Sequence, residues 1–160
     1  MFLAVGALCA GLVAYLLYVS ARAVEDCRLR WMAAGCSVAC LGMLANVGAQ
    51  PAVFPDGGPI TVGDDAMIAR YVVWHAGLAV AALLAVAGTA PTRARLVTFL
   101  ALALMALVWT SVATAPFGDL VTEAGFGTTA KLIVAVLVIV LAGAAAAWWR
   151  AEDGLPAWGA

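Results

Sequence analysis

The chain has 160 residues, of which 66% are hydrophobic and only 11% are charged, and its mean hydropathy is +1.08. Soluble domains contain about 45–50% apolar residues, so this composition indicates an integral membrane protein and excludes an ordinary soluble domain. The formal net charge of −1 provides no basic surface for nucleic acid and argues against that class of partner.

Five apolar windows are each long enough to cross a bilayer, which takes roughly 20 residues per helix. We therefore predict an all-α fold: an integral membrane bundle of five transmembrane helices at 1–150, followed by a short cytoplasmic tail at 151–160. The predicted spans cover about 2–20, 31–49, 66–88, 96–115 and 130–149.

The first window ends near Ala21-Arg22-Ala23, which is similar to a small-x-small signal-peptide cleavage site. The residues before the apolar run carry no positive side chain, however, and the run is as long as a full span. We therefore expect an uncleaved membrane helix. Tyr15 and Tyr18 stand toward its cytoplasmic end, where aromatic rings favour the interface.

The second window contains Cys36 and Cys40, which share a helix face at i, i+4. They are candidates for a metal or redox pair, but the favoured interpretation is that they are small apolar packing residues. The connection at 46–65 carries three prolines and four glycines. We expect it to form an outside loop that folds back over the mouth of the bundle.

The third window carries the segment RYVVWHAG at 70–77, which holds the only histidine of the chain. With a rise of 1.5 Å per residue, His75 lies on the order of 14 Å inward from the start of this span. An ionisable side chain within a span is costly and by default points toward a partner, a cavity or a pathway. We therefore predict a ligand-binding or sensing site in the outer half of the bundle, formed by Arg70, Tyr71, Trp74, His75, Trp109 and Asn46.

Structural roles for the same side chains stay open. Arg70 would extend to the outer interface and pair with an acid there, one of Asp64, Asp65 and Glu123. His75 would be a neutral imidazole bonded to Tyr71 at i−4 or to a hydroxyl of the fourth span. The tryptophans would be packing residues rather than the walls of a cavity.

The placement of basic residues predicts the orientation, because positive side chains that flank spans stay in the cytoplasm. Six arginines fall on one side of the predicted spans: Arg22, Arg28, Arg30, Arg93, Arg95 and Arg150. Only Arg70 and Lys131 fall on the other side. The amino terminus is therefore predicted outside and the carboxyl terminus in the cytoplasm, in a multi-pass protein of the cell inner membrane. Within the last span, GAAAA at 143–147 offers a smooth surface for a neighbouring helix.

Catalysis within the chain has little support. A single histidine, no metal-ligand spacing and no glycine loop leading to a phosphate site leave no set of residues for hydrolysis or group transfer. We predict a protein that is not an enzyme, with no catalytic residues and no metal site. A cofactor stays unknown, because haem at His75 would need a second ligand supplied by a partner.

Two families share motifs with the chain. The stretch Arg70-Tyr71-x-x-Trp74 resembles the third helix of microbial rhodopsins. Val73 stands where that family has an acid, and the only lysine, Lys131, stands at the outer mouth of the last span, so a retinal site is rejected.

The second resemblance covers roughly residues 10–150. Trp74-His75-Ala76-Gly77, preceded by a loop with Phe54-Pro55-Asp56-Gly57, is similar to the MASE4 family of bacterial membrane-associated sensor domains. Asp56 replaces the family's glycine, Leu78-Ala79 replaces its Phe-Pro, and the further helices and output domain of the family are not expected after the fifth span. The resemblance implies a sensory input, commonly coupled to a GGDEF domain that makes cyclic di-GMP, or to a kinase.

The leading hypothesis is a non-enzymatic sensory or regulatory membrane module that passes a signal to a cytoplasmic output protein. Arg70 would bind an anion or the loop acids, and His75 would sense a proton or a ligand. The alternative is a small structural or assembly subunit of a larger respiratory or photosynthetic membrane complex. Both hypotheses place the chain in the lipid bilayer with a protein partner, and both leave the ligand and the oligomeric state open.

Overall fold

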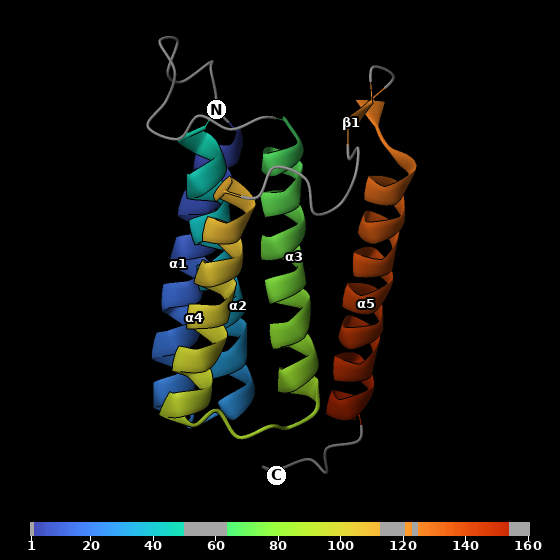
Figure 1. Ribbon diagram of the computed structural model, residues 1–160. Helices are drawn as coiled ribbons and strands as arrows, with labels where there is room; N and C mark the ends of the chain where they lie inside the picture. Colours follow the sequence, from blue (N-terminus) through green and yellow to red (C-terminus); the bar gives the residue numbers. More distant parts are fainter. Residues whose placement is uncertain (1, 50–63, 113–120, 123–124, 154–160) are drawn as a thin grey trace.

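The computed structural model describes residues 2–49, 64–112, 121–122 and 125–153. The described residues form five helices and one short pair of strands (Figure 1). The helices are α1 (Phe2–Ala23), α2 (Cys27–Val47), α3 (Asp64–Val86), α4 (Arg93–Val112) and α5 (Thr128–Asp153). β1 (Val121–Thr122) pairs antiparallel with β2 (Gly125–Phe126). The predicted helical architecture is therefore confirmed, and the loop at 50–63 lies outside the described residues.

Four of the described helices are long and apolar enough to cross a membrane: α1, α3, α4 and α5. They indicate a multi-pass membrane protein. The second predicted span forms a helix, but α2 does not reach the same apolar character, because it carries Arg28, Arg30, Ser37 and Asn46 among its apolar residues.

The helix ends differ from the predicted spans by a few residues, for local reasons. α2 begins at Cys27 rather than at 31, because the Asp26 carboxylate accepts a hydrogen bond from Arg28 N at 2.8 Å and caps the helix. α3 ends two residues before Gly88, whose positive φ of 64° permits a left-handed turn. In that turn Thr89 N donates to Leu84 O. α5 continues to Asp153, so the first three residues of the expected tail are helical.

Successive helices run in opposite directions, so α1 and α3 end where α2 and α4 begin (Figure 1). We call this the basic end of the bundle. The helix ends that flank the two short connections carry five arginines there: Arg22, Arg28, Arg30, Arg93 and Arg95. The charge asymmetry read from the sequence is thus also present in the arrangement of the helices.

The core lies along α2, which packs chiefly on α1 and α3. Glycines let α2 and α3 approach closely: a Cβ added at Gly42 would lie 2.6 Å from Trp74 Cβ, and one added at Gly77 would lie 2.8 Å from Val38 Cγ1. Small residues at contact points are the usual way for membrane helices to gain dispersion contacts. The least apolar helix of the chain is therefore the one most enclosed by other helices.

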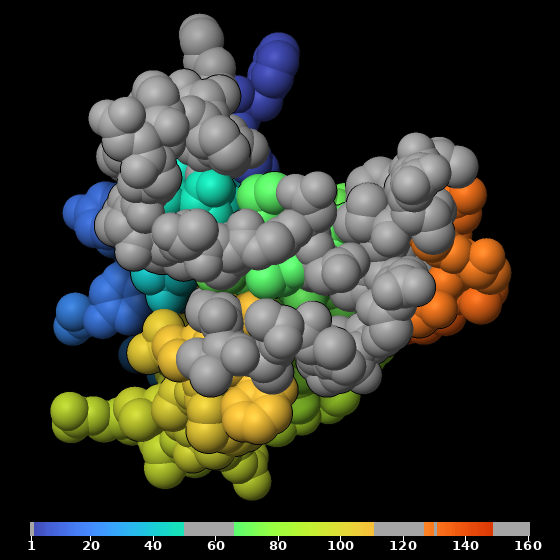
Figure 2. Space-filling model, turned by 45° about the horizontal axis from the view of Figure 1, so that its top comes forward, coloured from blue at the N-terminus to red at the C-terminus, as the bar shows by residue number. Residues whose placement is uncertain are grey.

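Helix α5 is held differently. It packs mainly on α3 and stands on the side of the molecule opposite α1, as both the ribbon and the space-filling view show (Figures 1 and 2). Among the α5 side chains that the structure describes, only that of Ala144 is buried. Large apolar side chains such as Leu132 and Ile139 lie on its outer surface.

Candidate functional site

Arg70 lies fully buried between α2 and α3, with 0% of its surface exposed. Its Nη1 donates a hydrogen bond to Ala45 O at 3.3 Å. Ala45 belongs to the last turn of α2, where carbonyl groups lack the usual partners four residues on. A guanidinium at this position satisfies a terminal carbonyl and lies at the negative end of the helix dipole.

Asn46 makes the reciprocal contact. Its side chain is buried, and Nδ2 donates to Met67 O in the first turn of α3 at 3.3 Å. We call Arg70, Asn46 and the carbonyl groups of Ala45 and Met67 the α2–α3 clamp. Each helix thus supplies one side chain that bonds to the backbone of the other, at the end of the bundle opposite the basic end.

The side chain of Arg70 is buried against the end of α2. Its pairing with an acid at the outer interface stays a prediction. The side chains of Asp64, Asp65 and Glu123, proposed as its acidic partners, lie outside the described residues.

Trp74 continues the buried face of α3 one turn below Arg70. Its side chain packs on Val38 and Ala39 and on the surface of Gly42. Within the described part of the chain, Trp74 Nε1 and Asn46 Oδ1 are both buried and have no hydrogen-bond partner. Buried polar atoms normally find a partner, so the clamp region offers a donor and an acceptor to a small polar molecule.

His75 lies on a different face of α3 and is half-buried. Its Nδ1 lies 2.8 Å from Tyr71 O. Because a carbonyl oxygen only accepts, Nδ1 carries the proton, and in the neutral ring Nε2 is left as an acceptor. The imidazole also stacks on Trp74, with ring centroids 3.5 Å apart, and lies 3.9 Å from the Tyr71 ring. The i−4 bond to Tyr71 that the sequence analysis left open is therefore made, to the backbone oxygen.

Trp109 does not join this group. Its side chain is 61% exposed, on the outer surface of α4, so it does not wall the expected cavity. The next residue, Thr110, faces inward instead, and its Oγ1 donates to Leu107 O at 2.7 Å. A helix turns by about 100° per residue, so an error of one position is enough to exchange a lipid-facing residue for an inward-facing one.

No group of three or more histidine, cysteine, aspartate and glutamate residues within the described ranges could hold a metal ion. The four cysteines are free. His75 is the only histidine of the chain, so a haem or metal at this ring would depend on ligands of another kind or from another chain.

A second brace between α2 and α3 lies at the basic end and was not anticipated from the sequence. Trp31 is buried, its Nε1 donates to Thr89 O at 2.7 Å, and its ring meets Phe99 of α4 edge to face at 5.8 Å. In the sequence, the available signal was the glycine turn after α3. The carbonyl groups at a helix end need hydrogen-bond donors, and the indole N–H of Trp31 is such a donor.

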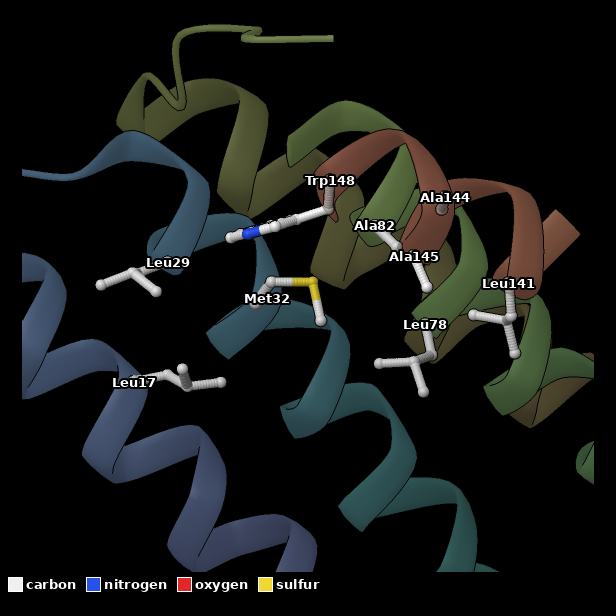
Figure 3. A pocket seen from close by; sticks show the side chains of 9 residues that line it. All are labelled: Leu17, Leu29, Met32, Leu78, Ala82, Leu141, Ala144, Ala145 and Trp148. Atoms are coloured by element: carbon white, nitrogen blue, oxygen red, sulfur yellow. The ribbon is translucent and has the colours of Figure 1, made fainter. Parts of the chain in front are cut away.

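Helices α2, α3 and α5 enclose a groove of about 480 Å³ that α1 borders with one residue (Figure 3). Apolar side chains line it: Leu17, Leu29, Met32, Leu78, Ala82, Leu141, Ala144, Ala145 and Trp148. At its rim, Arg28 Cζ lies 5.8 Å from the centre of the Trp148 ring. The sequence analysis predicted that GAAAA at 143–147 packs against a neighbouring helix. Ala144 and Ala145 of this segment line the groove, but the groove itself was not predicted.

The chain was compared with family models, curated proteins and solved structures, and none of them matches it.

Proposed function

We propose that the chain is a non-enzymatic sensory or regulatory membrane module, resembling the MASE4 input domains, that acts on a protein partner through α5. α1, α2 and α3 would form a fixed frame, and α5 would be the part that shifts. A signal of this kind needs a stimulus that favours one of two helix arrangements over the other. The partner would be contacted at the basic end, where α5 finishes.

The observation that supports this proposal is the contrast between the helix contacts. α2 is hydrogen-bonded to α3 at one end through Arg70 and Asn46, and to Thr89 in the turn after α3 at the other end through Trp31. α5 packs mainly on α3 and leaves an apolar groove beside α2. A helix with few buried contacts shifts at lower cost than one that is braced and closely packed.

The stimulus would act near the α2–α3 clamp. Asn46 Oδ1 and Trp74 Nε1 are the buried acceptor and donor available there, and the Nε2 atom of neutral His75 is a further acceptor on the adjoining face. The Tyr71 ring lies beside the imidazole, tilted by 45° with ring centroids 3.9 Å apart. A small polar molecule that bridges such groups gains the hydrogen bonds that the protein does not supply.

The proposal includes the finer topology. We place α2 as a fifth span, because its 21 residues reach about 30 Å, the thickness of the hydrocarbon core. The basic end would lie in the cytoplasm of a cell with this protein in its inner membrane. The carboxyl terminus would then be inside and the amino terminus outside.

The test joins a diguanylate cyclase domain after residue 153 and measures cyclic di-GMP in cells. His75→Gln keeps a polar side chain of similar reach but removes the imidazole, and Trp109→Phe, which stays apolar on the exposed surface, is the control. The proposal expects the His75 variant to change output by about fivefold, the lower range of common allosteric coupling. Arg70→Ala should change it as well. Unchanged output in both site variants would remove the sensing role from this segment.

A second candidate function is that of a subunit in a larger membrane complex. The exposed apolar faces of α1 and α5 favour it, since they offer room for further helices on both sides of the molecule. Purification in mild detergent distinguishes the two functions. A subunit should co-purify with the same large partner in fixed ratio, whereas a sensor should remain folded alone and gain thermal stability from its ligand.

A further inference from the structure

The groove between α2, α3 and α5 begins at the basic end of the bundle. Leu29 and Trp148 stand near that end, and Leu78 and Leu141 stand deeper along the helices (Figure 3). The seven residue steps from Trp148 to Leu141 correspond to about 10 Å along a helix axis. The groove therefore extends from the end of the bundle toward the middle of the proposed span.

The lining restricts the chemistry of an occupant. All nine residues of the groove wall are apolar, so a polar molecule would lose its hydrogen bonds to water and find few in return. The volume of about 480 Å³ lies in the range of roughly 300–1,000 Å³ typical of small-molecule pockets. A hydrocarbon tail satisfies both conditions.

The rim adds a positive charge to this apolar channel. The Arg28 guanidinium lies over the Trp148 ring, and Leu29, the next residue, is part of the groove wall. The helix ends that flank the two short connections at the same end add Arg22, Arg30, Arg93 and Arg95, together with the acids Glu25 and Asp26. The Asp26 carboxylate is already engaged as the cap of α2. The rim therefore favours an anionic head next to an apolar tail.

We propose that this groove binds an anionic glycerophospholipid, with an acyl chain between α2 and α5 and its phosphate at Arg28. Basic pockets between membrane helices are suited to anionic headgroups, and guanidinium binds phosphate through paired hydrogen bonds. The proposal depends on the membrane location of the chain and is independent of the sensory role. Bound lipid would fill the space between α5 and α2 and so join α5 to the rest of the bundle.

The experiment uses the purified full chain in detergent, titrated with phosphatidylglycerol or phosphatidylcholine. Native mass spectrometry counts bound lipid, and thermal unfolding reports the stabilisation. The wild type should bind phosphatidylglycerol at least about fivefold more tightly than phosphatidylcholine. Arg28→Gln should abolish this preference and leave phosphatidylcholine binding unchanged. Ala145→Phe, which places a ring in the groove, should reduce the binding of both lipids.

Arg93→Gln is the matched control, because it removes one positive charge from the same end but lies at the exposed start of α4, away from the groove. Equal losses in the Arg28 and Arg93 variants would mean general attraction to a basic surface and would overturn the site. Equal affinity of the wild type for the two lipids would do the same. The wild type could instead form dimers that Ala145→Phe abolishes, with no preference between the two lipids. That result would overturn the lipid site and assign the groove to a second copy of the chain. Circular dichroism confirms that each variant is folded.

Discussion

At the scale of single residues, the α2–α3 clamp explains how a guanidinium is kept inside an apolar bundle. A charge in the membrane interior is costly unless polar groups surround it, and Arg70 meets the carbonyl end of α2. The helix dipole adds a favourable interaction at that end. Arg70 therefore stabilises the junction of the two helices in addition to any role in binding.

Arg70→Ala should lower the free energy of unfolding by about 1–3 kcal/mol, the range for a hydrogen bond that involves a charged group together with its desolvated partner. SDS-induced unfolding in mixed micelles measures this change. Arg95→Ala is the control, because Arg95 also bonds a backbone carbonyl, Ala90 O at 3.1 Å, but is exposed. Its effect should stay within about 0.5 kcal/mol. If Arg70→Met, which keeps most of the volume, unfolds like the wild type, the hydrogen bond does not stabilise the junction.

Gly42→Ala should destabilise the bundle by about 1–3 kcal/mol, because the new methyl group would lie 2.6 Å from Trp74 and force the two helices apart. Gly143→Ala is the matched substitution on α5, where no atom lies within 4 Å of the added Cβ. It should be neutral or stabilising by up to about 1 kcal/mol, since alanine favours the helix. The same unfolding assay compares them, and equal effects would show that α2 and α3 are not closely packed at this point.

At the scale of elements, hydropathy was sufficient to predict the positions of all five helices to within a few residues, because a helix that faces lipid must be apolar along its length. It was least informative for α2. That helix contacts protein on several sides, so the Asn46 amide meets the Met67 carbonyl group of α3, whereas Ser37 Oγ donates to Ala33 O within α2 itself. Apolar length alone therefore does not identify the helix at the centre.

The candidate site was predicted in part, for a related reason. Depth along the membrane placed Arg70, Trp74 and Asn46 at similar levels, and the structure brings them together. Depth does not give the rotation of a helix about its axis, and Trp109 stands between the apolar run at 104–108 and the polar residues Thr110 and Ser111. Its outward orientation depends on how α4 docks on α2 and α3, which a single sequence of nearly uniform hydropathy does not specify.

The brace at the basic end gives a prediction for α2 as an element. Trp31→Phe keeps the aromatic contact with Phe99 but removes the donor to Thr89 O. It should cost about 0.5–1.5 kcal/mol in unfolding free energy, and hydrogen exchange at the start of α4 should become faster. Trp109→Phe on the exposed surface should change neither measurement. If Trp31→Phe leaves the hydrogen-exchange protection at the start of α4 unchanged, Trp31 does not stabilise α4 through Thr89 and Phe99.

At the scale of the whole molecule, the helices fall into a frame, α1 to α3, and two helices packed against it, α4 and α5. α1, α2 and α3 share the close contacts, the glycine approaches and the hydrogen bonds between elements. α5 lies outside this set, with a groove on one side and an exposed apolar surface on the other. A movement of α5 relative to the frame leaves those close contacts intact, and the proposed function depends on such a movement.

Distances between pairs of spin labels at the basic end show whether α5 moves relative to the frame. Ser20, Leu83 and Ala146 are exposed positions on α1, α3 and α5, and each label pair would be introduced after replacement of the four native cysteines. In phosphatidylcholine vesicles, pulsed electron–electron double resonance should give a narrow distribution of distances between labels at Ser20 and Leu83. The distribution between labels at Ser20 and Ala146 should be broad or have two peaks. Two equally narrow distributions, unchanged by His75→Gln, would contradict a mobile α5.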